Sequence, residues 1–453
     1  MKRSHWVRRT AVVMALALAV AACGDGDETP ETTDETEATE PEATDEVDTT
    51  EEVDGTEEVD GTEEEAAPGE SDGVLSLGYI LPESGPLAFL GPPQIEAMQL
   101  AVSDINAAGG VFGADVTVSS GDEAGDPTIA SESAQRLIGE GVDGIVGAAA
   151  SGMSLSFVEA VTSAGVLQCS GSNTAPTFTD NDYNGLYFRT APTDALQGPV
   201  LAETMVADGV TNPAILARAD DYGQGLMDAT IAELENAGAT VAAQITYDPE
   251  AANFEAEVNE VAGSGADGVA VIAFDEGAQI LATMVEAGLG PANIPVYGAD
   301  GLKSNDLAGL VDPNDESVLE GMRGTAPGGG EVSAEFIDRY REETGLEDTT
   351  FAPEVYDCTM LIALSAVAAG SDDGAAMGAE LVELTTGDTE CSTFEECVEA
   401  LEAGESIAYQ TASGVVLSRT STNNGEPESG TYEVWEIDDT GTVNTVDTVE
   451  SSF

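Results

Sequence analysis

Two loops of small and hydroxyl-bearing residues follow two short apolar runs in the first half of the chain. The run 144–147 leads into AAASGM, and the run 165–169 leads into SGSNTAP. Both runs have the length of buried strands, and Ser151 or Ser154 is placed to cap a helix between them. In a parallel α/β sheet, ligands bind at the carboxyl ends of strands, where such loops lie. Their hydroxyls and free backbone N–H groups predict a carboxylate-binding site rather than a catalytic centre.

Histidine chemistry is unavailable to most of this chain. The only histidine is His5, in an N-terminal segment that we expect to be removed. No imidazole then remains for a Ser-His-Asp or Cys-His site, or for a His-ligated metal. A GxSxG pattern at 69–73 lies in an acidic linker, so we interpret it as chance. We therefore expect a binding protein without metal or cofactor, not an enzyme, which would have to use carboxylate pairs alone.

The N-terminus has the features of an export signal. A basic segment, MKRSHWVRR, precedes an apolar run over 10–22 that is too short to span a bilayer. The run ends in Val-Ala-Ala before Cys23, which resembles a bacterial lipobox. We expect removal of residues 1–22 and a diacylglycerol anchor on Cys23 that holds the protein to the cell membrane. The alternative is ordinary cleavage after Ala22, and the pair Arg8-Arg9 leaves Sec and Tat export open.

The chain has a formal net charge of −75, and the acidity is not confined to one segment. Residues 23–73 form a low-complexity tether, which contains TEEVDG twice and too few apolar residues to fold. Residues 73–453 still hold 64 acidic against 8 basic residues, with Lys303 as their only lysine. Such a charge excludes nucleic-acid binding. Its self-repulsion predicts a halophilic or marine protein whose stability depends on salt.

Four cysteines follow Cys23, and export permits disulfides between them. The short CSTFEEC segment favours a Cys391–Cys397 bridge, which leaves Cys169 to pair with Cys358. The alternative for the second pair is two buried free thiols. A zinc site is not expected, because no histidine supports these cysteines.

Strand and helix patterns alternate from residue 74 onward, which is typical of an α/β fold. We assign 74–190 to a first lobe, to which about 325–405 returns, and 191–324 to a second lobe, which about 406–453 completes. The segment FRTAP at 188–192 marks the first passage between the lobes. The last fifty residues switch to alternating strands, with an Asn-Asn-Gly turn at 423–425.

Six short segments stand in a characteristic order along the folded chain. They are GPLA at 85–88, AMQLAVSDINAAGG at 97–110, GVL at 165–167, DYGQG at 221–225, YGADG at 297–301 and YD at 356–357. Together they resemble the type I periplasmic solute-binding proteins of ABC importers, most of all the branched-chain amino acid binding proteins. The resemblance covers about 75–435. It implies two Rossmann-like lobes, joined by three crossovers, that close on a small ligand and deliver it to an ABC permease.

The resemblance also implies which residues hold the ligand. Loops after the third and fourth strands bind the α-carboxylate in the amino-acid binders of this family, an aromatic residue covers the ligand, and an acidic residue takes the α-ammonium. The corresponding residues here are Ser151, Gly152, Ser172, Asn173 and Thr174 for the carboxylate, Tyr222 for the cover, Asp300 for the ammonium, and Phe89, Phe274 and Tyr356 as candidate walls of the side-chain pocket.

Each of these residues also has a purely structural interpretation. Ser151 suits a helix cap, Thr174 and Asp300 suit turns, and the aromatic residues suit a hydrophobic core. Charge balance favours ligand contact, because a zwitterion needs donors for its carboxylate and one carboxylate for its ammonium. Two departures bear on the ligand: Leu90 stands where an aromatic residue is frequent, and Asp300 is shorter than glutamate.

We thus expect a lipid-anchored extracytoplasmic protein that captures an amino acid, branched-chain or a similar small zwitterion, for an ABC permease. One alternative is a receptor module of the same fold that senses amides or urea-type solutes without transport. Another is a structural surface protein that binds no solute. A thermal-shift screen of amino acids, amides and urea separates these hypotheses, because a bound ligand stabilises the folded state.

Overall fold

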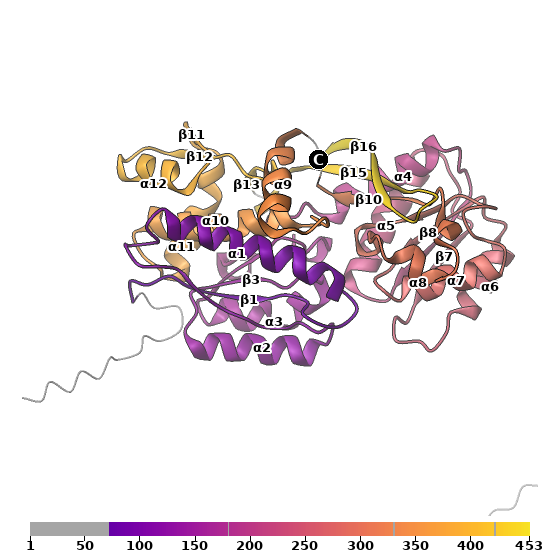
Figure 1. Ribbon diagram of the computed structural model, residues 1–453, viewed down its shortest axis with the longest axis horizontal. Coiled ribbons are helices and arrows are strands. Elements are labelled where there is room, and N and C mark those ends of the chain that lie inside the picture. Colours follow the sequence, from indigo (N-terminus) through magenta and orange to yellow (C-terminus); the bar gives the residue numbers. More distant parts are fainter. Residues whose placement is uncertain (1–71, 180, 329–330, 421–422) are drawn as a thin grey trace, which may run out of the picture. The chain divides into compact units, whose positions relative to one another are not determined.

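The computed structural model of the chain describes residues 72–179, 181–328, 331–420 and 423–453. The expected signal peptide, Cys23 and the tether up to residue 71 lie outside the described residues. Within the described part, two lobes are each built on a β-sheet that helices cover on both faces (Figure 1).

The first lobe contains a five-stranded parallel sheet with the order β2-β1-β3-β4-β5. Its strands are β1 (Ser76–Ile80), β2 (Thr117–Ser119), β3 (Gly144–Gly147), β4 (Leu167–Ser170) and β5 (Tyr187–Arg189). Helices α1 (Gly91–Ala107) and α10 (Ala352–Ala369) cover one face, and α2 (Pro127–Glu140) and α3 (Ser151–Ser163) cover the other. Because β3 is buried from both sides, it needs the unbroken apolar sequence that the run 144–147 shows.

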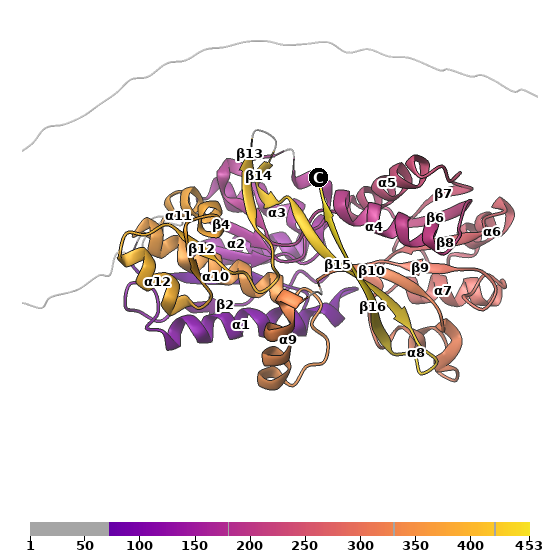
Figure 2. The ribbon, with the colours of Figure 1, turned by 90° about the horizontal axis from the view of Figure 1, so that it is seen from above.

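The second lobe contains a seven-stranded sheet with the order β16-β15-β10-β9-β8-β6-β7, in which β15 runs antiparallel to both neighbours. Its strands are β6 (Pro213–Arg218), β7 (Ala243–Tyr247), β8 (Gly268–Ile272), β9 (Val296–Gly298), β10 (Arg323–Pro327), β15 (Ser429–Ile437) and β16 (Val443–Ser452). One face packs on α4 (Asp194–Ala207) and α5 (Asp221–Asn236), and the other on α6 (Glu255–Ser264), α7 (Gly277–Glu286) and α8 (Leu307–Val311) (Figure 2).

The described chain passes between the lobes three times, as the sequence predicted. The passages lead from β5 to α4, from β10 to α9 (Glu331–Thr344), and from β14 (Asn423–Pro427) to β15. The expected lobe boundaries need two corrections. First, β10 extends the second sheet to Pro327. Second, 407–420 packs on the first lobe, since Tyr409 and Leu417 are buried in its core, so the described chain joins the second sheet only at β15.

The remaining elements extend the first lobe. They are α11 (Gly374–Glu380), β11 (Thr389–Cys391), α12 (Phe394–Glu402), β12 (Ile407–Tyr409) and β13 (Leu417–Thr420), with β11 paired to β12 and β13 paired to β14. Asn423 and Asn424 belong to β14, so the predicted turn at 423–425 is wrong.

Helix α10 forms the centre of the first-lobe core. Among the described helices it alone is long and apolar enough to cross a membrane, but 83% of it is buried inside the fold, as expected for a core helix. Cys358 on α10 forms a disulfide with Cys169 on β4, and a second disulfide joins Cys391 to Cys397. These are the pairs that the sequence favoured, and the first of them joins the central helix to the sheet.

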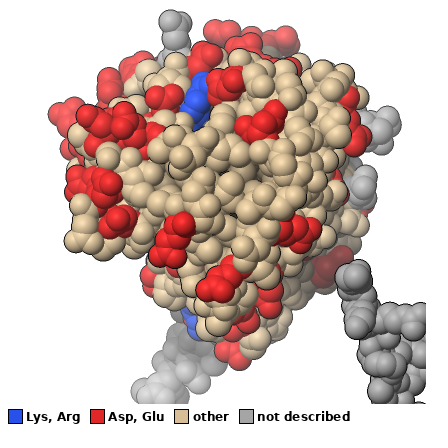
Figure 3. All heavy atoms as spheres, turned by 90° about the vertical axis from the view of Figure 1, so that its right-hand side faces the viewer, with Lys and Arg blue, Asp and Glu red and all other residues tan. Residues whose placement is uncertain are grey.

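The surface of the second lobe reflects the acidic composition. Figure 3 shows Asp and Glu side chains spread over the face that lies to the right in Figure 1, with Lys and Arg confined to small spots. The described basic residues are largely held in ion pairs, such as Arg189 with Glu426 and Arg218 with Glu276. The remaining acidic charge is therefore uncompensated, which is the condition under which salt screening matters.

Candidate functional site

A small cavity of about 20 Å³ lies between the two lobes, at the carboxyl ends of their parallel strands. Loops that follow β1, β3 and β4 approach it from the first lobe, and loops that follow β6, β8 and β9 approach it from the second. Its lining residues are Leu87, Leu90, Ala149, Ala150, Ser151, Ser172, Thr174, Tyr222, Phe274, Asp300, Gly301 and Phe351. Six of the predicted ligand-binding residues thus meet at one place: Ser151, Ser172, Thr174, Tyr222, Phe274 and Asp300.

The loop before α3 presents hydrogen-bond donors to this cavity. Ser151 is the first residue of α3, so its backbone N–H and that of Gly152 have no acceptor within the helix, and the helix dipole favours an anion there. The loop itself is held by Glu123, whose Oε2 accepts hydrogen bonds from the backbone N–H groups of Ala149 (2.7 Å) and Ala150 (3.2 Å). Complete burial raises the pKa of Glu123 to about 8.

The loop after β4 is tied to the loop before α3. The Asn173 amide donates hydrogen bonds to the carbonyl oxygens of Ala148 and Ala149, each at 3.0 Å, and its own oxygen accepts one from the Tyr187 hydroxyl. Asn173 therefore positions the two loops and does not line the cavity. The neighbouring side chains of Ser172 and Thr174 do line it, and both are almost fully buried.

The second lobe presents a carboxylate and two aromatic rings. Asp300 Oδ1 accepts hydrogen bonds from Gln197 Nε2 (2.8 Å) and the Tyr222 hydroxyl (3.1 Å). Tyr222 stacks on Phe274 with ring centroids 5.3 Å apart, and the guanidinium carbon of Arg218 lies 3.5 Å from the Phe274 centroid. Burial raises the pKa of Asp300 above its ordinary value, and the two donors oppose that shift.

A second buried carboxylate, Asp194, accompanies Asp300 and was missed by the sequence reasoning. It is the first residue of α4, directly after the first crossover, and it is fully buried. Burial and then the charge of Asp300 raise the pKa of Asp194. Neither of its oxygens makes a hydrogen bond of normal geometry, although the Thr174 hydroxyl is close enough to oppose the pKa shift. The signal in the sequence is the TDALQG segment that follows FRTAP, because it places an acidic residue directly after the first passage between the lobes.

Besides Asn173, three predicted residues lie outside the cavity lining. Tyr356 packs on Phe336 in the first-lobe core, and its hydroxyl donates a 2.7 Å hydrogen bond to Asp104, so the expectation that it walls the ligand pocket is not met. Gly152 lies one residue beyond the lining, on α3. Phe89 lines an adjoining apolar pocket of about 170 Å³, which shares Phe274 and Gly301 with the cavity.

Phe351 closes the cavity from the hinge of α9 and α10 and was also missed. Its φ of 62° is in the left-handed region, which is strained for a side chain of this size, and its ring is buried at 2% exposure. No local pattern marks such a residue, because it is held by packing in a cluster with residues distant in the chain, such as Leu87 and Tyr222.

The chain as a whole belongs to the periplasmic binding protein family, whose sequence profile matches residues 74–394. The fold is that of the type I members, as the sequence predicted. Among curated relatives, a Leu/Ile/Val-binding protein homolog 2 from Brucella abortus is 29% identical over 309 residues, which cover 67% of this chain and 81% of that protein. A Leu/Ile/Val-binding protein homolog 1 from Brucella suis is 28% identical over 302 residues, or 66% and 79% of the two chains.

Solved structures agree on the fold. The branched-chain amino acid binding protein LivJ from Streptococcus pneumoniae, in complex with isoleucine, superposes with a TM-score of 0.67 at 21% identity, covering 83% of this chain and 99% of that one. A solute-binding protein from Rhodopseudomonas palustris in complex with 4-hydroxybenzoate gives 0.66 at 17% identity, covering 84% and 98%. The same fold thus serves ligands of different chemistry, so the ligand here has to be argued from the site.

Proposed function

We propose that this protein captures an amino acid with an apolar side chain, branched-chain or of similar size, between its lobes and presents it to an ABC permease. The observation that carries the proposal is the division of one cavity into a donor side and an acceptor side. Ser151, Thr174 and the N-terminus of α3 suit an α-carboxylate, and Asp300 suits an α-ammonium, with the buried charge of Asp194 near it. The curated relatives, named for binding Leu, Ile and Val, support this assignment.

The apolar pocket beside the cavity supports an apolar side chain. Phe89, Leu302, Leu307 and Leu310 form much of its wall, and Phe274 and Gly301 connect it with the cavity. An apolar side chain that leaves the cavity past Phe274 would bury its surface there at about 25 cal/mol per Å². An anionic side chain would lose hydration without a cationic partner, because the charged residues in this wall are Asp275 and Asp306.

The N-terminal features complete the proposal. The lipobox-like sequence supports an anchor on Cys23, with 23–73 as a spacer between the membrane and the lobes.

The uncompensated acidic surface of the lobes supports adaptation of the protein to salt. We expect the melting temperature to be clearly higher in about 2 M than in about 10 mM sodium chloride. Equal melting temperatures at the two salt concentrations would contradict adaptation to salt.

Thermal-shift screening in high salt, followed by calorimetry, tests the ligand class. We expect leucine, isoleucine or valine to bind with a Kd of about 10 µM or tighter and to raise the melting temperature. The second candidate is a sensor of amides or urea-type solutes, which the small volume of the cavity favours. Stabilisation by urea analogues or small amides at low concentration, without stabilisation by any amino acid, would establish that candidate instead.

A further inference from the structure

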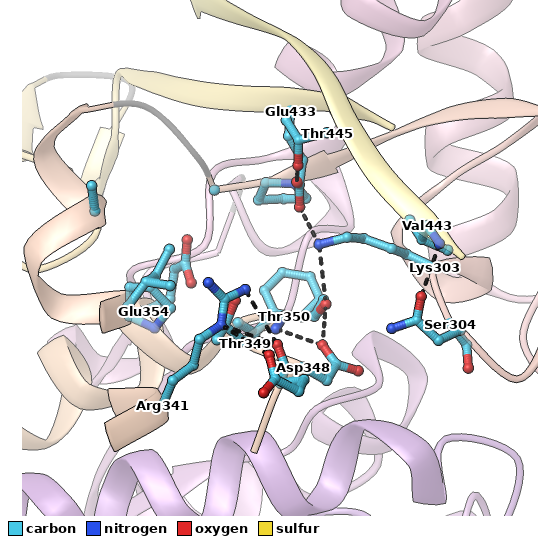
Figure 4. A pocket seen from close by; sticks show the side chains of 18 of the residues that line it. Lys303, Ser304, Arg341, Asp348, Thr349, Thr350, Glu354, Glu433, Val443 and Thr445 are labelled. Carbon is cyan, nitrogen blue, oxygen red and sulfur yellow. Dashed lines mark hydrogen bonds and ion pairs between the residues drawn. The ribbon is translucent and has the colours of Figure 1, made fainter. Parts of the chain in front are cut away.

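A larger pocket of about 460 Å³ lies on the other side of Phe351 from the amino-acid cavity. Lys303 and Glu433 reach it from the second lobe, and Arg341, Thr350 and Glu354 reach it from the first (Figure 4). We call it the hinge pocket. Phe351 lines both spaces, so it separates them as a wall.

Glu354 in the hinge pocket is a buried carboxylate with one oxygen that has no hydrogen-bond partner among the described residues. It lies in the first turn of α10, is 2% exposed, and its Oε2 accepts no hydrogen bond from any described residue. Figure 4 shows the side chain directed toward the pocket rather than into the helix core. Burial raises the pKa of Glu354 to about 8, with the charges of Asp357 and Glu433 adding to the shift and Lys303 opposing it. A buried oxygen without a donor is destabilising, and a donor from a ligand would offset that cost.

The two described basic side chains that line the hinge pocket interact with other residues of its wall and not with the Glu354 carboxylate through a hydrogen bond or ion pair. The Lys303 ammonium pairs with Glu433 and donates a hydrogen bond to Thr350 Oγ1 at 3.4 Å. The Arg341 guanidinium lies 3.9 Å from the Glu347 carboxylate. The lining holds five acidic and two basic side chains, which leaves an excess of negative charge around Glu354.

We propose that the hinge pocket binds a small organic cation whose guanidinium or primary ammonium group donates a hydrogen bond to Glu354. An N–H donor supplies what the Glu354 oxygen lacks, whereas a quaternary ammonium group has no hydrogen to donate. The volume exceeds that of a bare ion and is within the range of pockets for small organic ligands. The positive charge complements the excess of acidic side chains.

Occupation of the hinge pocket is coupled to lobe closure. Its walls come from both lobes, so the pocket is complete only when the lobes are together, and a ligand that contacts both walls stabilises that arrangement. The same arrangement forms the amino-acid cavity. A cation in the hinge pocket therefore strengthens binding in the cavity, and the reverse holds to the same extent.

Agmatine tests the proposal, because it carries a guanidinium and an ammonium group but no carboxylate for the Ser151 and Thr174 loops. In calorimetry with the complete chain we expect saturable binding of agmatine with a Kd below about 10 mM. Glu354→Gln should weaken it at least tenfold, and Glu354→Asp should retain part of it. Glu342→Gln is the matched control, because Glu342 is exposed on α9 and does not line the hinge pocket, and it should change the affinity less than twofold.

Asp300→Asn separates the two sites, since it alters the amino-acid cavity and should leave agmatine affinity unchanged. Absence of agmatine binding to the parent chain, equal binding by Glu354→Gln, or loss of binding in Asp300→Asn would each overturn the proposal. If Glu354→Gln does not fold, a crystal structure of the parent chain with agmatine decides. A ligand nitrogen within hydrogen-bond distance of Glu354 supports the proposal, and agmatine found only beside Asp300 contradicts it.

Discussion

The two sides of the amino-acid cavity differ in both chemistry and support. The first-lobe side consists of hydroxyls and backbone N–H groups, and its loops are fastened to each other by Asn173 and to Glu123. On the second-lobe side, Asp300 lines the cavity with the stacked rings of Tyr222 and Phe274, and the buried carboxylate of Asp194 lies close enough to Asp300 to feel its charge. One side is therefore a set of donors whose positions are fixed within one lobe. The other is a concentration of buried negative charge.

This difference indicates which lobe gains more from the ligand. The donors of the first lobe are arranged before a ligand arrives, so they cost little to organise. Burial raises the pKa of both second-lobe carboxylates, and the charge of Asp300 adds to the shift of Asp194, so an ammonium group would offset this concentration of negative charge. We infer that the α-ammonium contributes more to affinity than the α-carboxylate, and the following variants test that order.

Asp300→Ala should have the largest effect. It removes the acceptor for the ammonium and leaves Gln197 and Tyr222 without their shared partner. Loss of one member of such a buried charged pair costs about 2–5 kcal/mol, so amino-acid affinity should fall at least about thirtyfold. Calorimetry measures this, with Asp228→Ala, an exposed position on α5, as the control. Unchanged affinity would remove Asp300 from the site.

Thr174→Val should have the next largest effect, because it keeps the shape and deletes one donor to the carboxylate. A hydrogen bond to a charged group contributes about 1.5–3 kcal/mol, which corresponds to a loss of affinity of at least about tenfold. The exposed Thr240→Val is the control. A larger loss for Thr174→Val than for Asp300→Ala would reverse the order of the two sides.

Glu123→Gln tests whether the Glu123 carboxyl, which holds the loop before α3, makes the stability of the folded chain depend on pH. The pKa of Glu123 is about 8 in the folded chain against an ordinary 4.5, so folding favours its protonated form. Its contribution to stability is complete below about pH 4.5 and is lost as the pH rises to about 8. Relative to the parent chain, the variant should therefore gain stability between pH 5 and pH 8, as followed by thermal unfolding. The exposed Glu132→Gln should show no such trend, and a parallel pH dependence of the parent and Glu123→Gln would contradict this role.

Tyr356→Phe should have the smallest effect on binding. The Tyr356 hydroxyl bonds to Asp104 in the first-lobe core, so its loss should lower stability by about 1–3 kcal/mol and change affinity less than twofold. Tyr222→Phe, which removes a donor to Asp300, is the comparison and should weaken binding severalfold. If Tyr356→Phe weakened binding as much as Tyr222→Phe, our placement of Tyr356 outside the site would be wrong.

Residues that follow strands were the ones that sequence reasoning located well. Ser151, Thr174 and Asp300 each come directly after a buried strand, and parallel strands bring their carboxyl ends to one edge of the sheet. Tyr356 was placed in the pocket because its segment matched a family motif, yet it lies on the core side of α10. Helical periodicity could not decide this, because α10 is buried around nearly its whole circumference.

The sequence by itself determined the alternation of strands and helices, the hydroxyl-rich loops, the acidic charge and the local Cys391–Cys397 pair, because each depends on residues close together in the chain. Only the tertiary structure decided that Asp194 lies near Asp300, that 407–420 packs on the first lobe, and that Phe351 separates two pockets. These features join segments far apart in sequence. Their positions depend on which surfaces become buried against each other when the lobes pack, and a local sequence pattern does not contain that information.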